Sequence, residues 1–241
     1  MTFAEKTVRE IALESPASVR VFEEFKIDYC CGGGKSLTAA CQAAEAAPEV
    51  VQQMLNAVIE ESKSSSETKP PEYTSATELI RYILDRHHVF AKREMERLAP
   101  LMEKVSGKHG ARHPELNSLR KQFEILVGDL NPHMHKEEAV LFPFIESLDS
   151  ALSAEVSPPA APFGTIQNPI RMMMFEHETA GTILKAMRKL ANDYKAPADA
   201  CPSYNALYFG LEELERDLHM HIHLENNVLF PMAAELETAA A

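Results

Sequence analysis

Two short segments of the sequence carry the same arrangement of histidine and glutamate. Residues 133–143 read HMHKEEAVLFP and residues 221–231 read HIHLENNVLFP, which are identical at 7 of 11 positions. Each segment holds a histidine followed four residues later by a glutamate: His133 and Glu137, His221 and Glu225. Positions i and i+4 lie on one face of an α-helix, so each segment presents an imidazole and a carboxylate side by side. These two groups together are typical ligands of a metal ion.

A second pair of histidines repeats at nearly the same interval. His88 and His177 are 89 residues apart, and the two His-x-x-x-Glu segments are 88 residues apart. The C-terminal part therefore reads as two copies of one helix pair. All six groups fall on apolar stripes that are expected to face a helical core. Imidazoles and carboxylates are costly to bury alone, and bound metal ions would remove that cost.

The number and type of ligands indicate which metal is bound. Nitrogen and carboxylate oxygen without thiolate argue against an iron–sulfur cluster. Six ligands with two-fold repetition suit two ions, each taking two histidines, with Glu137 and Glu225 bridging the pair. Coordination positions would then stay open for a small diatomic molecule or for an oxo or hydroxo bridge. The sequence predicts two non-haem iron ions, with manganese as the alternative.

Four long amphipathic patterns position these ligands. They follow Ser75, Pro114, Asn168 and Ser203, and no segment shows the sustained alternation of a strand. We therefore predict an all-α protein with an up-down four-helix bundle. The inward stripe of the first helix is expected to run Ile80, Leu84, His88 and Ala91. Pro100 and Pro132 are expected to end or bend their helices.

A segment rich in serine and proline separates the bundle from the preceding part of the chain. We predict a small helical domain over 1–62, a linker over 63–74 and the bundle over 75–241. In the small domain, Thr7 and Glu10 form a capping box, and the sequence CCGGG at 30–34 must turn.

Composition excludes several classes of function. The 241 residues carry a formal net charge of −12, which argues against binding to nucleic acid or to anionic lipid. No stretch approaches the roughly 20 apolar residues of a membrane span. The N-terminus lacks an apolar signal core, so a cytoplasmic location is expected. Four cysteines in a chain of this length do not make a disulfide framework.

Other polar residues near the ligands have simpler interpretations. His135 and His223 are expected to turn away from the core and to lie either just outside the ligands or exposed to solvent. Ordinary positions on helix faces are expected for three residues: His87, Glu138 and His219. Glu176 either edges an access path or is a surface charge. From the residues alone, Cys30 and Cys31 are either an accessible thiol pair, able to bind a soft metal or exchange disulfides, or small apolar residues beside a turn.

The doubled His-x-x-x-Glu-x-x-x-Leu-Phe-Pro pattern over 77–241 resembles the hemerythrin-like di-iron domain. Hemerythrins place a further histidine where this chain has Gly181. This difference removes a ligand, leaves space beside the site and argues against simple oxygen carriage.

The N-terminal segment DYCCGGGKSL at 28–37 resembles the short first domain of the repair-of-iron-centres family. That resemblance implies the same six ligands, with Glu137 and Glu225 bridging. It implies repair of iron–sulfur clusters damaged by nitrosative or oxidative stress, with damaged iron–sulfur proteins as partners. Cys30 and Cys31 would then serve ligand access or iron transfer. Reduction of nitric oxide at the irons, and sensing or storage of nitric oxide or dioxygen, are the alternatives. The linker permits the N-terminal domain to dock within one chain or to exchange between two chains, so a homodimer is a further alternative.

Overall fold

The computed structural model describes residues 3, 6–64, 74–158 and 160–240. The chain divides into two compact units. One comprises Met1–Thr74 together with Ile222–Val228, and the other comprises Ser75–His221 and Leu229–Ala241. The linker predicted over 63–74 lies mostly outside the described residues. Within the described part of the chain, no helix has the length and apolar character needed to cross a membrane.

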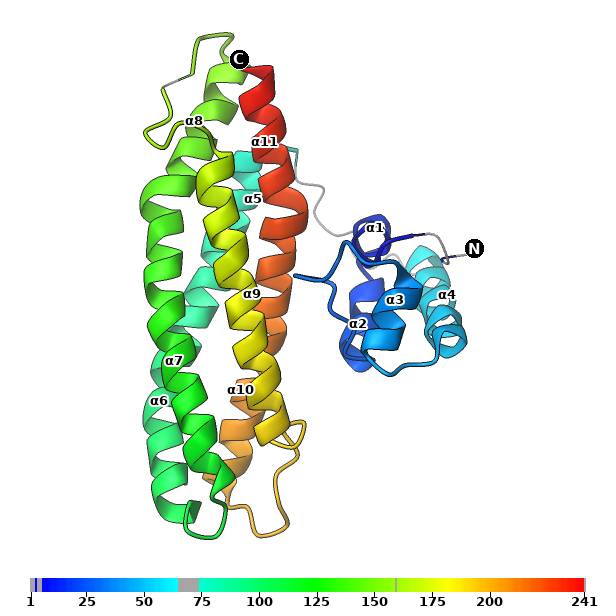
Figure 1. The fold of residues 1–241 in the computed structure, drawn as a ribbon, viewed down its shortest axis with the longest axis vertical. Helices are drawn as coiled ribbons and strands as arrows, with labels where there is room; N and C mark the ends of the chain where they lie inside the picture. The colour runs from blue at the N-terminus through cyan, green and yellow to red at the C-terminus, as the bar shows by residue number, and fades with distance from the viewer. Residues whose placement is uncertain (1–2, 4–5, 65–73, 159, 241) are drawn as a thin grey trace. The chain divides into compact units, whose positions relative to one another are not determined.

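Four helical columns run alternately up and down to form the bundle (Figure 1). The first column comprises α5 (Ala76–Tyr82), η1 (Ile83–His88) and α6 (Val89–His109). The second comprises α7 (Glu115–Lys136), η2 (Glu137–Leu141) and α8 (Phe142–Ser153). The third is α9 (Gln167–Leu190), and the fourth comprises α10 (Pro202–Leu224), η3 (Glu225–Leu229) and α11 (Phe230–Ala239). No strand occurs among the described residues, so the predicted all-α bundle is confirmed.

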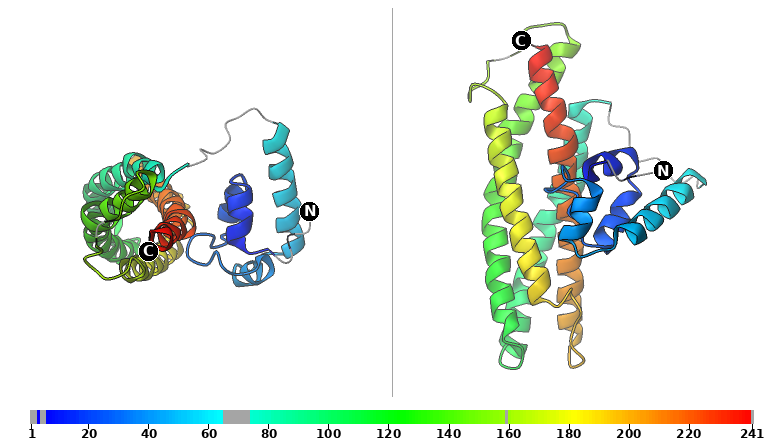
Figure 2. Two further views of the ribbon diagram at one scale, coloured as in Figure 1. Left: turned by 90° about the horizontal axis from the view of Figure 1, so that it is seen from above. Right: turned by 45° about the vertical axis from the view of Figure 1, so that its right-hand side comes forward.

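The apolar stripes of the four columns meet along the bundle axis, and an end-on view shows the columns surrounding a common interior (Figure 2). One continuous cluster of buried residues fills the half of the bundle that contains α6 and the start of α10. This cluster extends to within one helical turn of each predicted ligand histidine, through Ala91, Leu130, Ala180 and Leu218. Buried apolar side chains continue on the other side of the histidines, for example Ile145 and Phe230. The predicted ligands therefore lie between two apolar parts of the bundle interior.

Three columns widen locally into π-helix. In η2 the N–H of Phe142 donates to the carbonyl of Glu137, five residues earlier, and in η1 the N–H of Val89 donates to the carbonyl of Leu84. Single π-turns inside α-helices occur often at functional sites. Here η1 ends at one predicted ligand, and η2 and η3 each begin at another.

The π-turn in η1 corrects the inward stripe predicted for the first helix. Ile83 is fully buried, whereas Leu84 is only half-buried. The prediction assumed 3.6 residues per turn, and the wider turn shifts the buried face by one residue. The same shift brings two consecutive side chains, His87 and His88, into the interior.

Pro100 and Pro132 do not end their helices, contrary to one of the outcomes expected from the sequence. Pro100 lies inside α6 and Pro132 lies inside α7. Both side chains are exposed, so each ring faces solvent rather than a neighbouring column. Packing of the buried residues on either side offsets the backbone hydrogen bond that each proline removes.

The first unit contains α1 (Val8–Glu14), α2 (Ser18–Glu24), α3 (Leu37–Ala43) and α4 (Pro48–Ser64). The predicted capping box begins α1: the Thr7 hydroxyl accepts from the N–H of Glu10, whose carboxylate accepts from the N–H of Thr7. An isolated bridge pairs Thr7 with Ser36, and the turn at 28–34 lies between α2 and α3.

Candidate metal centre

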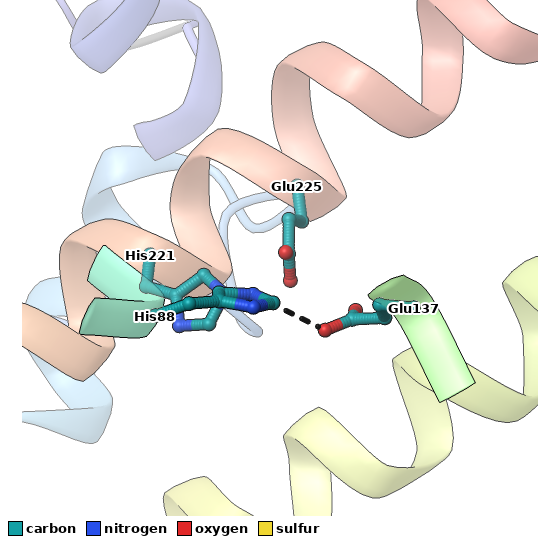
Figure 3. Close-up of side chains that lie close together, drawn as sticks. All are labelled: His88, Glu137, His221 and Glu225. Atoms are coloured by element: carbon teal, nitrogen blue, oxygen red, sulfur yellow. Dashed lines mark hydrogen bonds and ion pairs between the residues drawn. The ribbon is translucent and has the colours of Figure 1, made fainter. Parts of the chain in front are cut away.

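The structure brings all six predicted ligands together inside the bundle. They form two groups of four residues, and within each group one ligand atom per residue lies within 4.8 Å of the others. Figure 3 shows the first group. The groups are as follows: His88, Glu137, His221 and Glu225; His133, Glu137, His177 and Glu225. Each group takes two histidines of its own, and the two glutamates belong to both groups. Every one of these side chains is buried.

The histidines of each group point their Nε2 atoms at one another. The distance between these atoms is 3.1 Å for His88 and His221, and 3.0 Å for His133 and His177. Two nitrogens bound to one ion at about 2.1 Å and at right angles lie about 3.0 Å apart. The two pairs therefore have the spacing of neighbouring ligands on one ion.

The environment of Glu137 is the strongest indication of a cation. Its side chain is 0% exposed, and neither carboxylate oxygen has a hydrogen-bond partner among the described residues. Three imidazole Nε2 atoms lie near these oxygens, at 3.3 Å in His133, 3.5 Å in His88 and 4.0 Å in His177. A carboxylate buried without donors is strongly destabilising. Cations placed between it and the imidazoles would satisfy both kinds of group, so the residues present fit a pair of metal ions.

Two carboxylates at the edge of the site contact predicted ligand histidines at Nδ1, the ring nitrogen that does not face the other histidine of the pair. His88 Nδ1 lies 2.7 Å from a carboxylate oxygen of Glu138, which Lys92 also contacts at 2.5 Å. Histidines that bind metal commonly donate their second N–H to a carboxylate, which fixes the ring and its tautomer. Glu138 was predicted to be an ordinary helix-face residue. The structure corrects this because the side chain reaches from η2 to the histidine at the end of η1.

Glu176 makes the equivalent contact in the other group. Its carboxylate lies 2.7 Å from His133 Nδ1 and also pairs with Lys136. Burial alone would raise the pKa of both Glu138 and Glu176, but the hydrogen bonds from a lysine and a histidine hold both pKa values below the usual range. Each group thus has one histidine oriented by a lysine-bound carboxylate.

Replacing Glu138 with glutamine is expected to weaken Fe²⁺ binding about 10–100-fold, because His88 loses the charged acceptor that orients it. Affinity is measured by competition with a chelator of known strength. Glu124→Gln is the matched control, since Glu124 lies on the same column with its side chain 61% exposed. Equal affinities in the two variants would show that Glu138 does not position the ligand.

His87 was also predicted to be an ordinary helix-face residue and is instead buried beside the site. Its Nδ1 lies 3.0 Å from a carboxylate oxygen of Asp217, one turn before His221 on α10. Its ring stacks on that of His221 at a centroid distance of 5.8 Å and an angle of 10°. The π-turn of η1 places His87 there, and a stripe with α-helical period does not predict it.

The remaining histidines differ from one another. His135 is exposed, as expected, whereas His223 is buried. Burial lowers the pKa of His223 to about 4, so its ring is neutral near neutral pH, and Asn227 Nδ2 lies 3.1 Å from its Nδ1. His219 is half-buried with Nε2 3.7 Å from Glu215. Neither His219 nor His223 belongs to a ligand group.

The other predicted site residues lie outside the two groups. Gly181 is buried in α9, one turn after His177. Cys30 is buried and Cys31 is half-buried, and the two side chains are thiols that are not joined in a disulfide. The neighbouring Cys31 thiol, burial and the Asp28 carboxylate together raise the pKa of Cys30 well above its usual value. Asp28 was not among the predicted site residues.

Two family models match the chain. The hemerythrin HHE cation-binding domain matches residues 79–233, and a domain of unknown function named ScdA_N matches residues 4–59. The first match contains all six predicted ligands, and the second contains the two adjacent cysteines.

Curated relatives align over nearly the whole chain. A probable iron-sulfur cluster repair protein of Haemophilus influenzae is 34% identical over 233 residues, covering 96% of this chain and 97% of the relative. The iron-sulfur cluster repair protein YtfE of Musicola paradisiaca is 33% identical over 238 residues, covering 97% and 98%. The YtfE protein of Edwardsiella ictaluri is 32% identical over 234 residues, with the same coverage.

Proposed function

Since this chain belongs to the family of iron–sulfur cluster repair proteins that carry a hemerythrin HHE domain, we propose that it restores iron to iron–sulfur clusters damaged by nitrosative or oxidative stress. The iron would come from the His/Glu centre of the bundle. The observation that carries the proposal is the sharing of two buried glutamates between two groups of ligands. Family membership confirms the resemblance drawn from the sequence and supports iron–sulfur proteins as the partners.

The centre is proposed to hold two non-haem iron ions, with an oxo or hydroxo bridge in the oxidised state. His88 and His221 would bind one ion, His133 and His177 the other, and Glu137 and Glu225 both. When bound, the irons supply redox chemistry and the cargo for repair. Such ions take neutral imidazoles and ionised carboxylates as ligands, and residues of both kinds are gathered inside the bundle.

The protein's own residues control access to the centre. Phe142 lies beside His88 at a ring distance of 5.7 Å, and Phe230 stacks on His177 at 6.0 Å and 4°. These apolar rings keep water from two of the imidazoles. Glu138 and Glu176 are partly exposed, and each contacts the Nδ1 atom of a ligand histidine. We propose that these two carboxylates accept the Nδ1–H groups of His88 and His133, which keeps each Nε2 atom unprotonated and directed at the position where iron would bind and leave.

The test is transfer of labelled iron. The full-length chain is loaded with ⁵⁷Fe and mixed, without oxygen, with a dehydratase whose four-iron cluster has lost one iron. Dithionite supplies the electron needed for insertion of Fe²⁺ into the oxidised three-iron cluster. We expect ⁵⁷Fe in the acceptor's cluster by Mössbauer spectroscopy, together with recovered dehydratase activity. Recovery without ⁵⁷Fe in the cluster would contradict donation by this protein.

The matched control is the Glu137→Gln, Glu225→Gln protein exposed to the same amount of ⁵⁷Fe. It should transfer no more label than the buffer alone, because it lacks both shared ligands. Two further outcomes would replace the proposal. Steady consumption of nitric oxide with an electron donor and no loss of iron would identify a nitric oxide reductase. Reversible gas binding with the iron retained would identify a sensor or store.

A further inference from the structure

A second cluster of metal-binding side chains lies in the turn after α2. One ligand atom from each of three residues, Asp28, Cys30 and Cys31, lies within 4.8 Å of the others. The cluster contains two thiols and a carboxylate and no imidazole, so it differs in chemistry from the His/Glu centre. All three residues belong to the first unit, and none is a ligand of the bundle.

We propose that Asp28, Cys30 and Cys31 form a site for a thiophilic divalent cation such as Fe²⁺ or Zn²⁺. Thiolates select these ions over Mg²⁺ and Ca²⁺, which prefer ligands made only of oxygen. Three protein ligands leave one tetrahedral position open, as in sites that exchange a ligand. The inference stands on the geometry of the turn and does not depend on the proposed repair function.

The spacing of the two thiols matches a single ion. The Sγ atoms of Cys30 and Cys31 are 3.8 Å apart. Two sulfurs bound tetrahedrally to one ion at about 2.3 Å lie about 3.8 Å apart. The carboxylate is close as well, because Asp28 Oδ1 lies 3.5 Å from Cys30 Sγ. A cation could therefore bind with only small side-chain movements.

The backbone of the turn holds the carboxylate beside the thiols. Asp28 Oδ1 accepts hydrogen bonds from the N–H groups of Cys31, at 3.0 Å, and Gly32, at 2.9 Å. Glycine is needed where the chain folds back on itself, because a Cβ on Gly33 would lie 2.8 Å from the carbonyl oxygen of Tyr29. These two main-chain hydrogen bonds fix the Asp28 carboxylate beside the two thiols.

Binding of the cation to the two thiols releases their protons. A divalent cation replaces the two thiol protons, so M²⁺ and two R–SH groups give M(SR)₂ and two H⁺. Asp28 contributes a charge and loses no proton. We therefore expect close to two protons released for each ion bound at neutral pH.

The probe is Cd²⁺, added to the full-length chain whose bundle centre is already filled with iron. A phosphine keeps the thiols reduced, and oxygen is excluded. We expect thiolate-to-cadmium absorption in the ultraviolet that saturates at about one ion per chain, with the proton release measured in weak buffer. Cys30→Ser and Cys31→Ser should each abolish this stoichiometric binding. Cys41→Ala and Cys201→Ser are the matched controls and should leave it unchanged.

Asp28→Asn separates the ligand role of Asp28 from its role in the turn. Asparagine keeps an oxygen that can accept from Cys31 and Gly32 but removes the charge, so Cd²⁺ binding should weaken about tenfold or more. Thermal unfolding checks that the variant is folded, and X-ray absorption of the wild-type complex should show two sulfur ligands. The proposal is overturned if the wild-type band is absent, if it persists in Cys30→Ser, or if Asp28→Asn binds as tightly as wild type.

Discussion

Replacing Glu137 with glutamine is expected to remove iron from both positions of the centre. Glu137 belongs to both groups of ligands, so its loss weakens each of them. The iron content should fall from about two ions per chain to well below one. The absorption of the oxidised centre should disappear with it. Metal analysis of purified protein and its visible spectrum measure these two effects.

Single histidine variants provide the contrast that makes this result specific. His88→Ala removes a ligand from one group and leaves the other group complete, so about one iron per chain should remain. The exposed Glu124→Gln substitution should leave both irons in place. If Glu137→Gln and His88→Ala lost the same fraction of iron, the two ions would not share this carboxylate.

The second large effect is on thermal stability. Metal should stabilise the wild-type protein, whereas without metal a variant that lacks the two shared glutamates should be the more stable protein. Metal that binds only the folded protein stabilises it by about 2.7 kcal/mol when its free concentration is 100 times Kd. In a domain of this size that corresponds to about 5–10 °C in Tm. Chelation should therefore lower the Tm of the wild-type protein by this amount, as followed by circular dichroism without oxygen.

The metal-free Glu137→Gln, Glu225→Gln protein should, in contrast, unfold at a higher temperature than the metal-free wild type. Glutamine removes charge from the interior and supplies an N–H₂ group that can donate to the Nε2 atom of His133, which is 3.3 Å from Glu137 in the wild type. Adding iron should not raise the Tm of this variant. A metal-free variant less stable than the metal-free wild type would mean that the two carboxylates stabilise the fold without metal.

The internal repeat explains why the clustering of the six His and Glu residues could be predicted from the sequence. His133 with Glu137 and His221 with Glu225 recur in nearly identical segments, and a helix places residues four apart on one face whatever surrounds it. Their burial followed from the apolar positions one turn away. The position of each His and Glu on its helix face depends only on the spacing of residues within one helix, which the sequence determines.

The contacts of Glu138 and Glu176 with the histidines could not be predicted, because they depend on how neighbouring columns are aligned. Glu138 reaches His88, and Glu176 reaches His133, across contacts between different columns. A lysine three or four residues after each of these histidines was a visible signal, but nothing in the sequence showed which carboxylate it would meet. Asp28 was missed because its role depends on the path of a turn rather than on a repeat.

His87 was missed for a different reason. The predicted stripe assumed an α-helix throughout, and one wide turn is enough to bring an adjacent residue inside. Neither proline nor glycine occurs in Ile83–His88 to mark the change. Local helix geometry of this kind depends on packing in the folded protein, and the hydrophobic period alone does not predict it.

The wide turns also bear on the ancestry of the bundle. Segments η2 and η3 are both five residues long, both begin at a shared glutamate and both end just before a Phe-Pro pair. A wide turn amounts to one extra residue inserted in a helix. Its presence at the same point in both copies indicates that the insertion occurred before an ancestral gene segment was duplicated. The wide turn in η1 has no counterpart in α9, so this feature distinguishes the two halves of the bundle.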